Sequence, residues 1–142
     1  MAKPKIKKLS VPSTLTDVLK VQQQIIADAA AQGFGDHARF AIRLALDEAL
    51  SNAVNHGNKG DSSKKVHVEY SVSDDEVVVS ITDDGPGFNP SAVPDPTLDE
   101  NLERPHGRGV MLMRAYMTDV SFNPKGNCVT LVKKRNCKLP HA

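Results

Sequence analysis

The segment EALSNAVNHG at 48–57 carries a carboxylate, an amide and an imidazole at four-residue steps, in Glu48, Asn52 and His56. At 3.6 residues per turn, these three side chains lie near one side of a helix. Such a strip can be an ordinary solvated helix face or part of a site. The motifs that follow it along the chain favour the second interpretation.

A second motif, DDGPGF at 83–88, places Asp83 at the end of a hydrophobic strand, two residues ahead of Gly85 and four ahead of Gly87. An ionised carboxylate only accepts hydrogen bonds, so it prefers an amino group, such as that of adenine, over a carbonyl. The glycines let the backbone pass close to a base and sugar because no side chain intervenes. The alternative is a tight turn, since Asp-Gly and Pro-Gly pairs are common in turns.

The third motif, HGRGVMLM at 106–113, opens a predicted helix with Gly107, Arg108 and Gly109. Backbone N–H groups at the start of a helix point toward an anion, and Arg108 or Arg104 can add positive charge. A single Gly-x-Gly is weak evidence and also occurs at plain loop-to-helix joints. Together, and in this order, the three motifs predict a nucleotide-binding site.

The polar strip lies on a helix predicted from Asp36 to about Asn55. A rotation of about 100° per residue gathers one apolar arc for the core, made of Ile42, Leu46, Ala49, Leu50 and Ala53. The opposite, solvent arc contains Arg43, Asp47 and Ser51. Glu48, Asn52 and Asn55 fall in neither arc and share their side with small and apolar residues, Ala41, Leu44 and Ala45. We therefore expect the polar groups to face a partly apolar cleft.

Two further helices and five strands complete the predicted fold. One helix runs from a cap at Ser13 or Thr14 to Gly33, with an apolar stripe of Leu15, Val18, Leu19, Ile25, Ile26 and Ala29. The other helix covers about 109–117. Strands are predicted at 6–11, 66–72, 77–81, 120–122 and 128–133, with 66–72 and 77–81 forming a hairpin. The Pro-rich segment 89–105 is predicted as a long functional loop, and 136–142 as a disordered tail.

Composition limits the classes of protein that the chain can belong to. A length of 142 residues suits a single domain spanning 1–142, with its core at about 10–135. With 18 basic and 17 acidic residues and 4% aromatics, the chain has no feature of direct nucleic-acid or membrane binding. It has neither a membrane-length apolar run nor a signal-peptide core, so we expect a cytoplasmic protein. Cys128 and Cys137 lack metal-ligand spacing.

The order and spacing of the three motifs resemble the N, G1 and G2 boxes of the GHKL ATPase superfamily, and most closely its anti-sigma-factor serine kinases. The segment LERPHGRGVMLMRAYMTDVSF ahead of a final hairpin, and the compact size, resemble those kinases as well. The resemblance implies an α+β two-layer sandwich, the Bergerat ATP-binding fold. Its mixed, mainly antiparallel sheet of four or five strands is backed by about three helices.

By this resemblance Glu48 is the catalytic base, and Asn52 binds Mg²⁺. Asp83 corresponds to the G1 aspartate that recognises adenine. Residues implied in cofactor binding are Asn52, Asn55, Asp83, Gly85, Gly87, Gly107, Arg108, Gly109 and Val110. The cofactors implied are ATP and Mg²⁺. A Pro105-His106 pair precedes the glycines where the family has one small residue, so Arg104 and Arg108 both remain candidates for phosphate binding.

The activity implied is serine/threonine phosphorylation of a STAS-type anti-anti-sigma protein, combined with sequestration of a sigma factor. The chain could also form a homodimer. Three alternatives remain. The first is an ATP-gated binding module without kinase activity, and the second is a detached histidine-kinase catalytic domain, for which the chain has no room for a dimerising helical pair. The third is a scaffold that binds no nucleotide and whose glycines serve only in turns.

Overall fold

The computed structural model describes residues 5–85 and 105–135, in which the backbone forms a single sheet backed by helices. The strands are β1 (Lys7–Pro12), β2 (Lys65–Val72), β3 (Glu76–Asp83), β4 (Asp119–Phe122) and β5 (Cys128–Lys134). The helices are α1 (Leu15–Ala31), α2 (Asp36–Asn52), the π-helical turn η1 (Ala53–Gly57) and α3 (Pro105–Tyr116).

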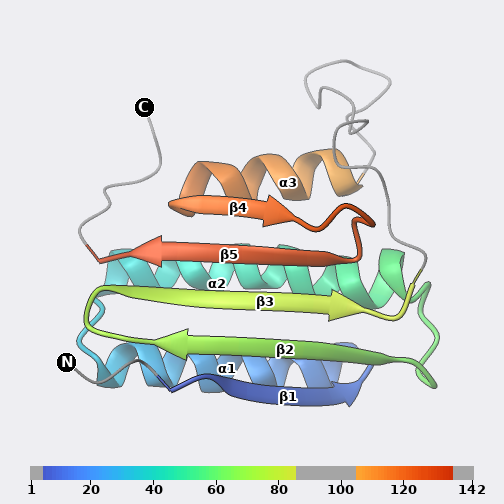
Figure 1. The fold of residues 1–142 in the computed structure, drawn as a ribbon, viewed down its shortest axis with the longest axis horizontal. Coiled ribbons are helices and arrows are strands. Elements are labelled where there is room, and N and C mark those ends of the chain that lie inside the picture. The colour runs from blue at the N-terminus through green and yellow to red at the C-terminus, as the bar shows by residue number, and fades with distance from the viewer. Residues whose placement is uncertain (1–4, 86–104, 136–142) are drawn as a thin grey trace.

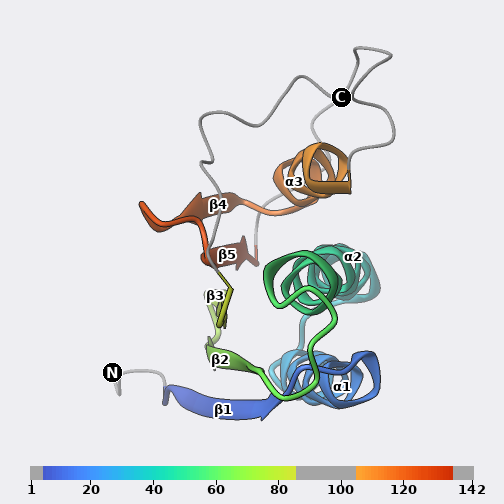
Figure 2. The same cartoon turned by 90° about the vertical axis from the view of Figure 1, so that its right-hand side faces the viewer.

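The sheet places its strands in the order β1-β2-β3-β5-β4, as Figure 1 shows. All four pairings among the described strands are antiparallel, so the parallel component of a mixed sheet is not found there. The described helices all cover the same face of the sheet, and no helix from the described residues lies on the other face (Figure 2). This arrangement confirms the predicted α+β two-layer fold.

Helix α1 has the local signals that its sequence predicts. The Thr14 hydroxyl oxygen accepts a hydrogen bond from the Asp17 backbone N–H at 3.1 Å, which satisfies one of the unpaired donors of the first turn. The helix ends at Ala31, and Gly33 follows with a φ of +85°, a conformation that favours glycine. The structure therefore confirms both predicted ends of this helix.

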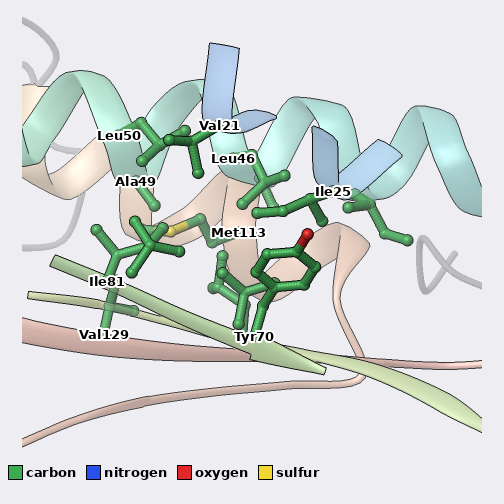
Figure 3. Packing of buried hydrophobic residues seen from close by; sticks show 14 of the residues in the cluster. Val21, Ile25, Leu46, Ala49, Leu50, Tyr70, Ile81, Met113 and Val129 are labelled. Atoms are coloured by element: carbon green, nitrogen blue, oxygen red, sulfur yellow. The ribbon is translucent and has the colours of Figure 1, made fainter. Parts of the chain in front are cut away.

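The core fills the space between the helices and the sheet. Val21, Ile25, Leu46, Leu50 and Tyr70 are among the side chains that meet there, as Figure 3 shows. All five residues predicted for the inner arc of α2 are buried. Leu15 and Leu19, by contrast, are 54% and 47% exposed, so their inclusion in the apolar stripe of α1 was wrong. Periodicity locates the centre of a stripe, whereas the curvature of the neighbouring layer decides how far its edges are covered.

Several predicted boundaries shift by a few residues. Helix α3 begins at Pro105, four residues before the predicted start. Pro can occupy the first turn of a helix because the N–H that it lacks would have no partner there. Strand β1 extends through Pro12, which an edge strand tolerates. Residues 89–104 of the predicted loop 89–105 and the predicted tail, 136–142, lie outside the described residues. None of the described helices has the length and apolar character needed to cross a membrane.

Candidate functional site

A cavity lies where the end of α2, the end of β3, helix α3 and the β4–β5 turn meet. Its lining combines apolar groups with a few polar ones: Ala49, Asn52, Ala53, His56, Gly57, Ile81, Asp83, Val110, Met113, Phe122, Gly126, Asn127, Cys128 and Val129. A mainly apolar cavity with a small number of polar groups is typical of a site for an organic ligand. Residues from all three sequence motifs are therefore brought to one place.

Only some of the polar residues predicted on one side of α2 line the cavity. Asn52 and His56 line the cavity, as does Val110 from the third motif, which is 5% exposed. Glu48, one turn before Asn52, is half-buried and lies outside the lining. Asn55 is exposed and is absent from the lining, so the structure does not bring it to the cavity with the others.

The predicted helix does not run regularly to Asn55. Helix α2 stops at Asn52, and the chain widens into η1, where the N–H of Asn58 donates to the carbonyl of Ala53, five residues earlier, at 2.8 Å. Single π turns inside helices occur frequently at functional sites. Here the turn places Gly57 against Asp83: a Cβ on Gly57 would lie 2.2 Å from Asp83 Oδ2. Only glycine fits at this position without displacing the carboxylate.

Asp83 is the last residue of β3 and is partly buried beside η1. Its Oδ1 accepts a hydrogen bond from the N–H of Gly85 at 2.8 Å, and its Oδ2 accepts none from the described part of the chain. Burial raises the pKa of the Asp83 carboxyl above its usual range, and the charge of Asp84 adds to this, while the Gly85 hydrogen bond lowers it. The site therefore holds a desolvated acceptor with one oxygen available to a ligand.

Gly85 does not line the cavity but closes the turn behind Asp83. A Cβ on Gly85 would lie 1.8 Å from the carbonyl oxygen of Gly57, so the two backbones touch. Less is described of the other glycines of the motifs. Gly107 and Gly109 lie in the first turns of α3, where only the backbone is described, as is the case for Arg108. Gly87 and Arg104 lie outside the described residues.

Two asparagines that the sequence did not single out hold Asp83 in place. The Asn127 side chain donates to the Asp83 carbonyl at 3.1 Å, and the Asp83 N–H donates to the Asn127 carbonyl at 2.9 Å. Asn58 accepts from the N–H of Asp84 at 2.8 Å. Only turn propensity marks these residues in the sequence, because their partners lie 44 and 26 positions away.

The side chain of Asp84 has different partners from that of its neighbour Asp83. Its carboxylate accepts from the N–H of Lys65 at 2.8 Å and contacts His67 Nε2 at 2.9 Å. These interactions hold the pKa of Asp84 below its usual range. Asp84 does not line the cavity, so the two adjacent carboxylates have separate environments.

Comparison with known proteins agrees with this geometry. A family model described as "Histidine kinase-like ATPase domain" matches residues 11–133, nearly the whole chain. The chain belongs to this family of nucleotide-using domains, and the predicted membership of the GHKL superfamily is thereby confirmed.

Within the family, the chain is similar to named bacterial regulators. It is 35% identical over 101 residues to "Anti-sigma F factor" of Clostridium perfringens, covering 67% of this chain and 71% of that protein. It is 31% identical over 112 residues to "Serine/threonine-protein kinase BtrW" of Bordetella bronchiseptica, covering 78% and 77%. It is 29% identical over 120 residues to "Serine-protein kinase RsbW" of Listeria innocua, covering 78% and 74%.

A solved structure shares the fold. It contains the RsbU and RsbW domains of Rv1364c from Mycobacterium tuberculosis and superimposes with a TM-score of 0.63 at 18% identity. The match covers 99% of this chain and 34% of that one. The fold of the chain is therefore that of an established structural class.

Proposed function

We propose that this chain is an ATP-dependent serine/threonine protein kinase that also acts as an anti-sigma factor. The observation that carries the proposal is the joint position of Asp83 and Asn52 in one cavity, with Glu48 one helical turn from Asn52. The names of the relatives, an anti-sigma factor and two serine kinases, agree with it. Because sigma factors act on RNA polymerase inside the cell, we place the protein in the cytoplasm.

Adenine binds at the buried end of the cavity in this proposal. Asp83 Oδ2 accepts a hydrogen bond from the adenine amino group, in a place where a carbonyl would be repelled. The apolar lining, which includes Ile81, Val110 and Met113, receives the faces of the base. The sugar and phosphates then extend toward the N-terminus of α3, whose backbone N–H groups suit an anion.

Asn52 is the residue that would hold Mg²⁺. The described residues contain no cluster of three or more His, Cys, Asp or Glu side chains that could hold a metal ion, so an all-protein cage is not available there. Mg²⁺ commonly keeps several waters and takes one or two protein oxygens together with phosphate oxygens, and the partly buried Asn52 in the cavity wall fits that role. When bound, the ion neutralises phosphate charge.

Glu48 acts as the general base. A serine or threonine hydroxyl of the partner protein attacks the γ-phosphorus of ATP, and Glu48 takes the hydroxyl proton. The bond from the γ-phosphorus to its bridging oxygen breaks, so ADP leaves and a phosphoester forms on the partner. The partner is a STAS-type anti-anti-sigma protein, and the added phosphate charge ends its competition with the sigma factor.

Phosphate transfer by Glu48→Gln tests the enzymatic part of the proposal. Glutamine keeps the size of the side chain but cannot take a proton, so the rate should fall by about 10²–10⁴ while Mg-ATP binding is retained. The control is Asp47→Asn, which changes an exposed carboxylate one residue away and should transfer phosphate at the wild-type rate. The assay follows radiolabelled phosphate from ATP to proteins that co-purify with the chain.

Three results would change the proposal. Transfer by Glu48→Gln at the wild-type rate would exclude Glu48 as the base. A wild type that binds ATP but transfers no phosphate would favour the nucleotide-gated binding module. Failure to bind ATP at all would favour a scaffold. Light scattering of the same sample measures whether the chain forms the expected homodimer.

A further inference from the structure

Asn58 is a fully buried polar residue, 0% exposed, directly after η1. Its side-chain nitrogen donates to the Ser13 hydroxyl at 2.9 Å and to the Lys65 carbonyl at 3.0 Å. Its side-chain oxygen accepts from the N–H of Asp84 at 2.8 Å. A buried amide whose groups all have partners is costly to alter, because each lost partner leaves an unsatisfied group in the interior.

The two ends of this amide serve different parts of the molecule. The nitrogen ties η1 to the β1–α1 junction and to the start of β2. The oxygen holds the backbone between Asp83 and Gly85, which is the turn that carries the adenine acceptor. Gly85 also lies against the carbonyl oxygen of Gly57, the last residue of η1. The turn therefore contacts this part of the chain at two neighbouring residues, Gly57 and Asn58.

We propose that Asn58 is a positioning residue for adenine recognition, a role that rests on the proposed binding of adenine by Asp83. By holding the Asp84 N–H, its amide oxygen fixes the distance between η1 and the end of β3. The Asp83 carboxylate therefore stands in its binding position before the nucleotide arrives. Without this hydrogen bond, the turn has to be ordered on binding, and that cost reduces affinity.

Adenosine affinity separates this role from a purely structural one. Asn58→Ala removes the hydrogen bond to the Asp84 N–H. We expect adenosine and ATP to bind about three- to tenfold more weakly, the equivalent of one lost hydrogen bond. Both ligands should lose the same factor, because the defect lies at the base and not at the phosphates. In steady-state transfer assays KM for ATP should rise, with kcat nearly unchanged.

Ser13→Ala provides the matched control. It removes a buried partner from the nitrogen end of the same amide and leaves the hydrogen bond to Asp84 in place. We expect Ser13→Ala to lower the unfolding temperature but to bind adenosine like the wild type. Calorimetric titration at a temperature where both variants are folded compares them directly. Equal losses of affinity in the two variants, or wild-type affinity in Asn58→Ala, would overturn the inference.

Hydrogen exchange in the wild type tests the contact if Asn58→Ala does not fold. The Asp84 amide should exchange slowly without ligand and more slowly with adenosine; an unprotected Asp84 amide in both states would overturn the inference. Asp83→Ala distinguishes failure of the inference from failure of the proposed function. Loss of adenosine binding in Asp83→Ala with wild-type affinity in Asn58→Ala refutes only the positioning role. A wild type that does not bind adenosine or ATP refutes both.

Discussion

Asp83→Asn isolates the hydrogen bond on which the proposed recognition of adenine depends. The substitution keeps Oδ1, which accepts the Gly85 N–H at 2.8 Å, and replaces Oδ2 with an NH₂ group. Where the carboxylate would accept from the adenine amino group, the amide presents a second donor. Loss of a hydrogen bond to a charged group is worth about 1.5–3 kcal/mol, so ATP should bind roughly 10- to 150-fold more weakly.

The same substitution should change which base is preferred. Inosine triphosphate has a carbonyl where ATP has its amino group, and the new NH₂ can donate to it. We therefore expect the ratio of ATP to ITP affinity to fall by more than the ATP affinity alone. Asp47→Asn is the control, because that exposed carboxylate lies outside the cavity lining and should leave both affinities unchanged. Unchanged ATP affinity in a folded Asp83→Asn protein, measured by calorimetry, would refute the assignment.

Asp83→Asn should raise the thermal stability of the nucleotide-free protein although it lowers the affinity for ATP. Burial places the pKa of Asp83 in the folded protein above its value in the unfolded chain. A group with a raised pKa stabilises the fold at low pH, and this contribution is lost as the pH rises through the folded value. At neutral pH the ionised carboxylate therefore weakens the nucleotide-free protein, and Asp83→Asn should unfold at a higher temperature. The difference should shrink on acidification, as thermal unfolding at neutral and acid pH can measure.

Substitutions at three further residues test contacts away from the cavity, each by urea unfolding. Lys133 is fully buried and donates to the Tyr116 carbonyl at 2.8 Å, so Lys133→Met should cost about 1–3 kcal/mol by leaving that carbonyl without this donor. The Arg135 guanidinium lies 4.2 Å from the centre of the Phe34 ring and donates to three backbone carbonyls. Arg135→Ala should lower the free energy of unfolding by about 1–2 kcal/mol, and Arg135→Lys should recover only part of this loss. Hydrogen bonds from an ammonium and a phenol lower the pKa of Asp28, so its stabilising effect is present at neutral pH and is lost as the pH falls. The difference in stability between the wild type and Asp28→Asn should therefore close below about pH 4.

Sequence periodicity predicted the parts of the fold that depend on local geometry. The inner arc of α2 is buried as expected because a regular helix repeats every 3.6 residues. The hairpin of β2 and β3 forms where apolar residues alternate on both sides of a short polar turn. Asp83 could be placed at the end of its strand for the same reason, and it lines the same cavity as Asn52 and Val110.

Sequence periodicity could not predict the features that depend on contacts between distant segments. The π turn at Ala53–Gly57 breaks the repeat that extended the helix to Asn55, and that residue is exposed and does not line the cavity. Asn58 and Asn127 bind Asp84 and Asp83 only after segments 26 and 44 residues apart have come together. Lys133 is buried because a helix C-terminus, 17 residues earlier in the chain, supplies an acceptor. No local pattern indicates that an amide or an ammonium will have a buried partner.

Several departures from local rules lie side by side at the cavity. A π turn, a buried amide and a carboxylate with a raised pKa come together around Asp83, although η1 and Asn58 lie some 26 positions earlier in the chain. Each is unfavourable alone, and natural proteins accept such features where function requires them. A desolvated carboxylate binds an amino group more strongly than a solvated one, because low polarity strengthens hydrogen bonds. In the proposed function, the π turn and Asn58 hold this buried acceptor in position. The free energy that Asp83 costs the empty protein is, in that proposal, the counterpart of its selectivity for the base.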